Sequence, residues 1–144
     1  MRCVDVTVLV YAHRSESPNH RAHRAWFEDA LNDSEPLAVP PIVASGFLRI
    51  VTHPKIFRDP TPLESALSFV DTMRGAPAFR SIAPGERHWS IFTDLCHRLG
   101  ATGNRIPDAF LAALAIEHNA TWISADRGFA GYPGLRWQHP LDPV

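Results

Sequence analysis

A chain of 144 residues is long enough to bury a substantial core, and we expect residues 1–144 to form a single domain. Its formal net charge of -1 gives no overall attraction to nucleic acid, and no apolar run approaches the roughly 18 residues of a membrane span. Asp5 interrupts the apolar stretch that a signal peptide would need, and the two cysteines form no disulfide framework. We therefore expect a cytoplasmic protein with reduced thiols and no membrane contact.

The elements expected along the chain alternate between short strands and helices. The valine-rich run from Arg2 to Val10 is typical of a buried strand, although its last residues are also compatible with the start of a helix. Helices are expected over 20–32, 42–52, 62–74, 86–99 and 108–117, and further strands over 37–39, 78–83, 121–124 and 135–138.

Local signals refine several of these helices. Thr61 and Glu64 have the spacing of a capping box, with a proline between them at the first helical position. Trp89 falls on the apolar face of the helix over 86–99, so we expect it in the core. The helix over 108–117 is apolar around its whole circumference, which predicts a central, buried position.

The order of elements predicts the fold class. Helices between successive short strands imply crossover connections, and therefore an α/β three-layer sandwich with a mostly parallel central sheet flanked by helices. Ligands of such folds bind beyond the carboxyl ends of the strands. Asp126 lies at such an end, Asp5 lies in the first strand within reach of it, and Asp108 heads a helix entering from the same side. We therefore expect these three acids to share one crevice.

Each acid also has an ordinary structural interpretation. Asp5 can cap the following helix, Asp108 can be an N-cap, and Asp126 can form an Asx turn. If the acids converge, however, their carboxylates repel one another, and a hard divalent cation would relieve that repulsion. Oxygen ligands suit Mg²⁺ or Mn²⁺, and a metal-activated water beside a phosphodiester is a route to hydrolysis.

Several stretches resemble one known family in the right order along nearly the whole chain. MRCVDVTVLVYA at 1–12 resembles the opening strand of the PIN domain nucleases, and PDAFLAALA at 107–115 resembles their third acidic motif. TWISADRGF at 121–129, followed by YPGLRW at 132–137, resembles their fourth. GFLRIVTHP at 46–54 resembles the matching segment in one subgroup of the VapC toxins. Any one motif is weak, and the ordered set is specific.

This resemblance implies a PIN-like fold and Mg²⁺-dependent endonucleolytic cleavage of RNA, with Mn²⁺ as a substitute metal. It also implies the toxic component of a type II toxin–antitoxin system, a cognate VapB-type antitoxin as partner, and a homodimer. By position, the catalytic, metal-binding acids are Asp5, Asp108 and Asp126. Three neutral residues near them would either hold metal-bound waters or make ordinary turn and capping hydrogen bonds: Thr7, Asn104 and Ser124.

One position departs from the family pattern. The family commonly has a glutamate where this chain has Gly46, with Ser45 beside it, and Glu35 and Asp59 are too far along the chain to replace it. One metal ligand or water-orienting group is therefore absent. This leaves a second hypothesis, a catalytically impaired PIN-fold module that binds RNA or protein. A nuclease acting on DNA flaps ranks last, because the chain is too short for the helical arch of those enzymes.

Arginine supplies almost all of the positive charge, with Lys55 as the only lysine. Three arginines follow the first strand: Arg14, Arg21 and Arg24. They would either contact phosphate at the crevice mouth or form a solvated helix face paired with Glu28 or Asp29. Arg127, next to Asp126, would either balance its charge or contact phosphate.

Overall fold

A computed structural model describes all residues, 1–144, and its sheet has five strands. They are β1 (Arg2–Val4), β2 (Leu37–Ala38), β3 (Phe79–Arg80), β4 (Thr121–Ile123) and β5 (Trp137–Gln138). Their order across the sheet is β3-β2-β1-β4-β5, and every neighbouring pair is parallel. The parallel sheet predicted from the alternation of strands and helices is confirmed, and β1 lies at its centre.

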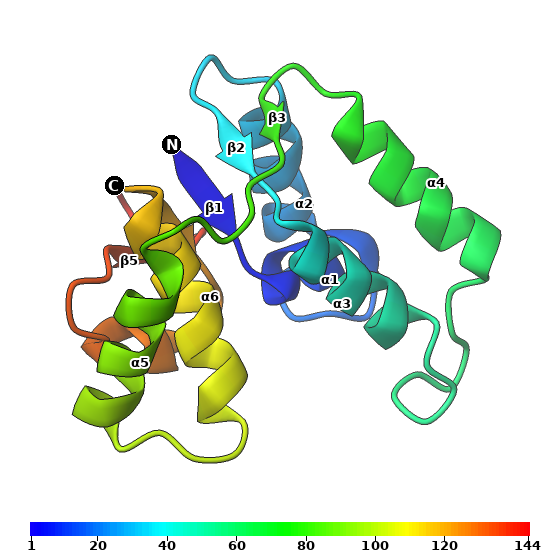
Figure 1. The fold of residues 1–144 in the computed structure, drawn as a ribbon. Coiled ribbons are helices and arrows are strands. Elements are labelled where there is room, and N and C mark those ends of the chain that lie inside the picture. The colour runs from blue at the N-terminus through cyan, green and yellow to red at the C-terminus, as the bar shows by residue number, and fades with distance from the viewer.

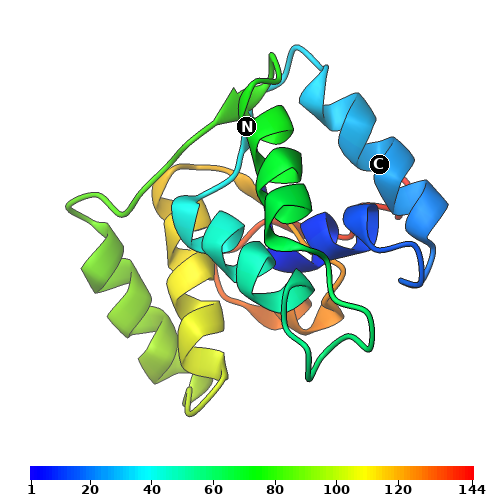
Figure 2. The same cartoon turned by 90° about the vertical axis from the view of Figure 1, so that its right-hand side faces the viewer.

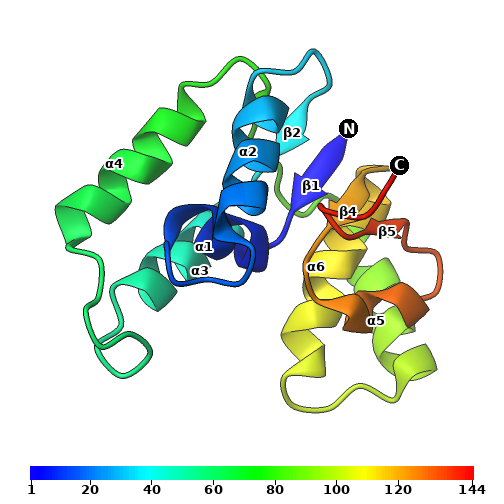
Figure 3. The same ribbon diagram turned by 180° about the vertical axis from the view of Figure 1, so that it is seen from behind.

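Six α-helices cover the sheet in two layers. They are α1 (Val6–His13), α2 (His20–Leu31), α3 (Pro41–Val51), α4 (Leu63–Arg74), α5 (His88–Leu99) and α6 (Arg105–Glu117), and a 3-10 helix, η1 (Arg127–Gly131), follows β4. The first four helices lie on one side of the sheet, and α5 and α6 lie on the other (Figure 1). From behind, β4 and β5 continue the sheet beside β1, on the side of α5 and α6 (Figure 3). The predicted three-layer sandwich is confirmed.

The helix α6 is the central helix that its sequence predicts. Ala109, Ala112, Ala113 and Ala115 are all fully buried, and their small side chains let the helix pack closely. Together with the strands and α1, they belong to one connected core of 29 buried residues. Burial of α6 matters for the site, because it holds the first turn of this helix beside the sheet.

The strand predicted over 2–10 is wrong after Val4, where the chain turns into α1. Val8, Leu9 and Val10 are buried in that helix, so a helix surrounded by core has the same valine-rich composition as a buried strand. Burial thus overrides the β-propensity of valine. As a consequence, Asp5 stands at the end of β1 and at the N-cap of α1, rather than inside a strand.

Two further predictions fail because tertiary contacts decide them. Thr61 does not cap α4, whose N-cap is Pro62. Instead, the Thr61 hydroxyl lies 3.0 Å from His13 Nε2 and accepts a hydrogen bond from Arg14 at 3.0 Å. Trp89 is 68% exposed, because α5 packs mainly against α6 and buries only one face.

No helix combines the length and the apolar character needed to cross a membrane.

Candidate active site

A cavity of about 430 Å³ lies where β1 and β4 end, between the two helical layers. Asp5, Asp108 and Asp126 all line it. Residues of α3 form one wall and residues of α6 form another, and the view in Figure 2 looks onto both helices. The structure therefore brings the three acids to one crevice at the carboxyl end of the central strands, as their positions in the sequence predict.

Asp5 is the most deeply buried of the three acids, with 5% of its surface exposed. One carboxylate oxygen, Oδ1, accepts a hydrogen bond from the Val6 N–H at 2.7 Å. The other, Oδ2, accepts hydrogen bonds from the Ser124 hydroxyl at 2.6 Å and from the Thr7 hydroxyl at 3.3 Å. Both oxygens are thus held in place, and each retains acceptor capacity for a further ligand.

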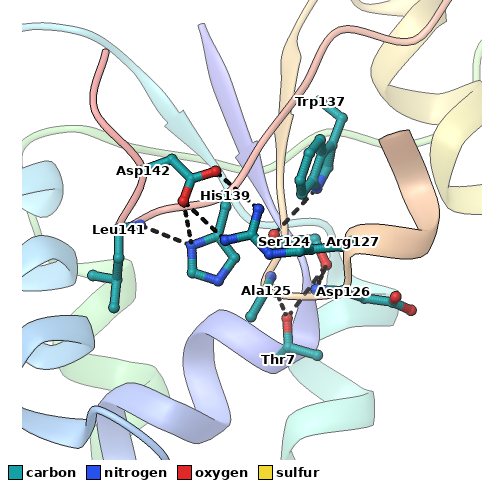
Figure 4. A network of polar contacts seen from close by, with 9 residues as sticks. All are labelled: Thr7, Ser124, Ala125, Asp126, Arg127, Trp137, His139, Leu141 and Asp142. Carbon is teal, nitrogen blue, oxygen red and sulfur yellow. Dashed lines mark hydrogen bonds and ion pairs between the residues drawn. The ribbon is translucent and has the colours of Figure 1, made fainter. Parts of the chain in front are cut away.

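A network of hydroxyl groups joins Asp5 to the segment after β4. The Ser124 hydroxyl, which donates to Asp5, accepts a hydrogen bond from the Asp126 N–H at 3.0 Å. Thr7 accepts one from the Ala125 N–H at 3.2 Å (Figure 4). Ser124 is fully buried. The network ties α1 to the β4–η1 junction, so the positions of Asp5 and Asp126 depend on each other.

Asp126 is an exposed residue that also makes the predicted turn. Its Oδ1 accepts a hydrogen bond from the Gly128 N–H at 2.8 Å, which caps η1. A Cβ on Gly128 would lie 3.0 Å from that oxygen, so the absence of a side chain allows the close approach. The Asp126 carboxylate points away from the Thr7–Ser124 network (Figure 4). A capping role and a place at the cavity therefore coexist.

Asp108 is the least constrained of the three. It is half-buried in the first turn of α6, which begins at Arg105, so Asp108 is not the N-cap. Its carboxylate has no hydrogen bond or ion pair within the protein, which leaves its oxygens available to a ligand. A negative charge in the first turn is favoured by the helix dipole.

The electrostatics of the cavity favour a cation. Burial raises the pKa of Asp5, and this outweighs the hydrogen bonds that lower it. Burial, followed by repulsion from Asp126, raises the pKa of Asp108. None of the three acids forms an ion pair with an arginine, lysine or histidine. Arg105 lowers the pKa of Asp108 only in part, so its raised pKa persists. Because a charge removed from water is costly without a close partner of opposite sign, a bound cation would stabilise these carboxylates.

The donor chemistry fits a hard divalent cation, because carboxylate and hydroxyl oxygens are the ligands that Mg²⁺ and Mn²⁺ prefer. The side chains are not gathered as a finished metal centre, since no three carboxylates, imidazoles or thiols in the structure converge closely enough to hold an ion. The metal-binding roles of the three acids stay predictions.

Several other candidate residues lie away from the cavity. Asn104 is exposed at the start of α6, makes no side-chain capping hydrogen bond, and does not line the cavity. Arg24 pairs with Glu28 at 2.9 Å, which matches the solvated-face alternative, whereas Arg14 is largely buried and contacts Glu16, Thr61 and the Asp59 carbonyl. Arg127 donates hydrogen bonds of 3.0 and 2.9 Å to Asp142 rather than balancing Asp126 (Figure 4).

Two residues on α3 lie at the cavity: Gly46, the position where the family has a glutamate, and Arg49, to which the sequence assigns no role. Gly46 and Arg49 both line the cavity, one helical turn apart. A Cβ on Gly46 would touch only Val6 Cγ2, at 3.8 Å, so the helix has room for a side chain facing the acids. Helical spacing from the expected position of the fourth acid is the signal that would have pointed to Arg49.

Comparison with known proteins agrees with this geometry. The model of the PIN domain family matches residues 2–135. A VapC ribonuclease of Mycobacterium bovis is 51% identical over 142 residues, covering 99% of this chain and 97% of that protein. Ribonuclease VapC25 of Mycobacterium tuberculosis is 40% identical, covering 97% of this chain and 99% of its own. A solved VapBC2 structure from Rickettsia felis, bound to a promoter DNA fragment, has a TM-score of 0.72 at 18% identity, covering 96% and 97% of the two chains.

The fold and the cavity define a PIN domain protein. The chain belongs to the PIN domain family and, within it, to the VapC ribonucleases.

Proposed function

We propose that this chain is a metal-dependent endoribonuclease and the toxic component of a type II toxin–antitoxin pair. The observation that carries the proposal is one cavity lined by three aspartates without a paired cation, in a chain 51% identical to a VapC ribonuclease. The substrate is RNA, the reaction is phosphodiester hydrolysis by water, and the metal is Mg²⁺, with Mn²⁺ as a substitute.

The residues of the chain have distinct parts in this reaction. Asp5 and Asp108 hold the cation, and Asp126 adds negative charge at the rim. Ser124 and Thr7 keep the Asp5 carboxylate in one orientation through their hydrogen bonds. When bound, a divalent cation supplies Lewis acidity toward a phosphodiester oxygen and lowers the pKa of a water molecule. Ile50, Leu111 and Phe129 line the same cavity and make its walls partly apolar.

A VapB-type antitoxin and a second copy of this chain are the proposed partners. Inhibition requires an antitoxin segment to cover the acidic cavity, and an arginine of that segment would suit the unpaired carboxylates. Ile42, 52% exposed, lines the acidic cavity and offers such a segment an apolar contact beside the acids. An RNA substrate and two cysteines that form no disulfide fit a cytoplasmic location.

Mapping of cleavage sites on total RNA tests the activity. Wild-type protein with Mg²⁺ should produce discrete new 5′ ends, and chelation of the metal should abolish them. Asp108→Asn preserves the size of the side chain and should produce no new 5′ ends, because it replaces the charged carboxylate, a proposed metal ligand, with a neutral amide. Wild-type cleavage levels in the Asp108→Asn protein would exclude this residue from the reaction, and cleavage in the presence of chelator would exclude the metal.

A binding module without cleavage remains the second candidate, because Gly46 occupies the position of the family's usual glutamate and no three ligands converge. Calorimetric titration with Mg²⁺ and Mn²⁺ separates the two functions. Metal binding at millimolar or lower concentration together with RNA cleavage supports the nuclease. RNA binding without metal binding and without cleavage supports the binding module.

If the chain binds metal, Gly46→Glu should strengthen that binding, with Gly46→Ala as the control for adding a side chain.

A further inference from the structure

Arg49 is the only cationic residue among those that line the acidic cavity. It projects from α3 on the same face as Ile42 and Gly46, which also line the cavity. The buried face of this helix is formed by other residues, namely Val43, Phe47 and Val51. The amphipathic pattern of α3 therefore directs Arg49 toward the acids and away from the core.

The Arg49 guanidinium is not used within the protein. Five other arginines form ion pairs with carboxylates: Arg2, Arg14, Arg24, Arg98 and Arg127. Arg49 forms neither an ion pair nor a side-chain hydrogen bond, although three carboxylates line the same cavity, and it is exposed to solvent. Its charge and all of its N–H donors are therefore available to a ligand.

The space beside Arg49 is open. Gly46, one turn earlier on α3, contributes no side chain, and even a Cβ there would meet only Val6 Cγ2, at 3.8 Å. The cavity of about 430 Å³ therefore has room for a ligand beside Gly46 on this wall.

We propose that Arg49 is a positioning residue that binds a backbone phosphate of the RNA and so places the neighbouring phosphodiester at Asp5 and Asp108. This proposal rests on the proposed ribonuclease function. Three carboxylates repel a polyanion, and the chain as a whole carries a net charge of -1, so attraction has to come from a local cation. The planar guanidinium matches phosphate with two parallel hydrogen bonds, and phosphate contacts set the register of a bound nucleic acid.

Binding without cleavage gives the first test. A labelled single-stranded oligoribonucleotide is titrated with protein in chelator at several salt concentrations. Arg49→Gln should weaken binding about tenfold or more and should reduce the slope of log K against log salt by about 0.7, the value for one phosphate contact on a single strand. Arg49→Lys should keep the wild-type slope, because it keeps the charge, while losing part of the affinity.

A matched control comes from α2. Arg21 is also exposed and also forms no ion pair, but it does not line the cavity. Arg21→Gln removes the same charge from the protein and should leave the salt slope unchanged. If Arg21→Gln and Arg49→Gln lower the slope equally, the effect is one of net charge and the assignment of Arg49 is overturned.

Kinetics in Mg²⁺ give the second test. Arg49→Gln should raise KM about tenfold with little change in kcat, the pattern of a residue that binds substrate and transition state alike. Wild-type protein that binds the RNA without cutting it would refute the ribonuclease function, and the salt slopes would still decide the role of Arg49. Equal slopes for wild type and Arg49→Gln, or no salt-dependent binding by wild type, would refute the role of Arg49.

Discussion

Asp108 differs from the other two acids because no donor in the protein holds its carboxylate. Burial and the nearby charge of Asp126 raise its pKa, so the folded protein binds this proton more tightly than the unfolded chain does. Stability therefore decreases as pH rises from the unfolded pKa through the raised folded pKa. The charged form of Asp108 costs stability at neutral pH, which is the state in which it would bind a cation.

Asp108→Asn should therefore raise the Tm near neutral pH in the absence of divalent metal. The gain should disappear below about pH 3.9, the ordinary value for aspartate, where the wild-type carboxyl is protonated in both states. Thermal melts followed by circular dichroism across pH measure this difference. Asp71→Asn, at an exposed site on α4 without an ion pair, is the control. A neutral-pH Tm equal to or below that of wild type would contradict the electrostatic account.

Ser124 is the residue through which Asp5 and the Asp126 backbone are connected. Ser124→Ala removes the hydrogen bond to Asp5 and leaves the Asp126 N–H without its acceptor. Loss of a group that orients a metal ligand typically costs 10- to 100-fold in affinity or activity, and we expect about that loss in Mg²⁺ affinity and RNA cleavage. Calorimetry and cleavage assays check it, with the exposed Ser81→Ala as control. Undiminished metal affinity in Ser124→Ala would mean that the network is structural only.

At the scale of elements, a contact with the C-terminal end of α6 holds the linker between β3 and α5. The Glu117 carboxylate accepts hydrogen bonds from the Gly85 N–H at 2.7 Å and the Arg87 N–H at 3.0 Å. A Cβ on Gly85 would lie 2.7 Å from Glu117 Oε2, so a side chain there would displace the Glu117 carboxylate from its present position. Because α6 also carries Asp108, this contact fixes the helical layer that forms one wall of the cavity.

The same contact predicts a pH-dependent stability. Although burial raises the pKa of Glu117, the two backbone hydrogen bonds lower it below its ordinary value. Its stabilisation is therefore present at neutral pH and is lost as pH falls through the lowered folded pKa. Glu117→Gln should reduce the Tm at neutral pH, and the difference should close in acid. Gly85→Ala breaks the same contact, so the double variant should lose less than the sum of the single losses. Additive losses would show that the two residues act separately.

At the scale of the whole molecule, a cation in the cavity would connect segments far apart in the sequence. It would link the β1–α1 junction, the first turn of α6 and the segment after β4, and none of these carboxylates is gathered when the chain is unfolded. Metal binding should therefore stabilise the fold by mass action, by about 2.7 kcal/mol at 100 times the dissociation constant. Wild-type Tm should rise with Mg²⁺ or Mn²⁺, and the Tm of Asp108→Asn should rise less. Equal shifts would place the metal elsewhere.

The broad architecture was predictable because it depends on local patterns. Hydrophobic periodicity and turn residues predict the order of strands and helices, and the need for crossover connections then makes the sheet parallel. Asp126 at a strand end and Asp108 near a helix start follow from the same patterns. The strand predicted through Val10 failed, since a fully buried helix and a buried strand are both valine-rich and only packing distinguishes them.

The sequence by itself determined the α/β class, the parallel sheet and the convergence of Asp5, Asp108 and Asp126 at its carboxyl edge. Only the tertiary structure decided which side chains meet there. The hydrogen bond between Ser124 and Asp5 joins residues 119 positions apart, and Thr61 contacts Arg14 instead of capping α4. The structure also shows that Arg49 lines the cavity of the three acids, while Arg14 and Arg24 pair elsewhere. Such pairings depend on how elements far apart in the sequence pack together, and local periodicity and spacing do not predict that packing.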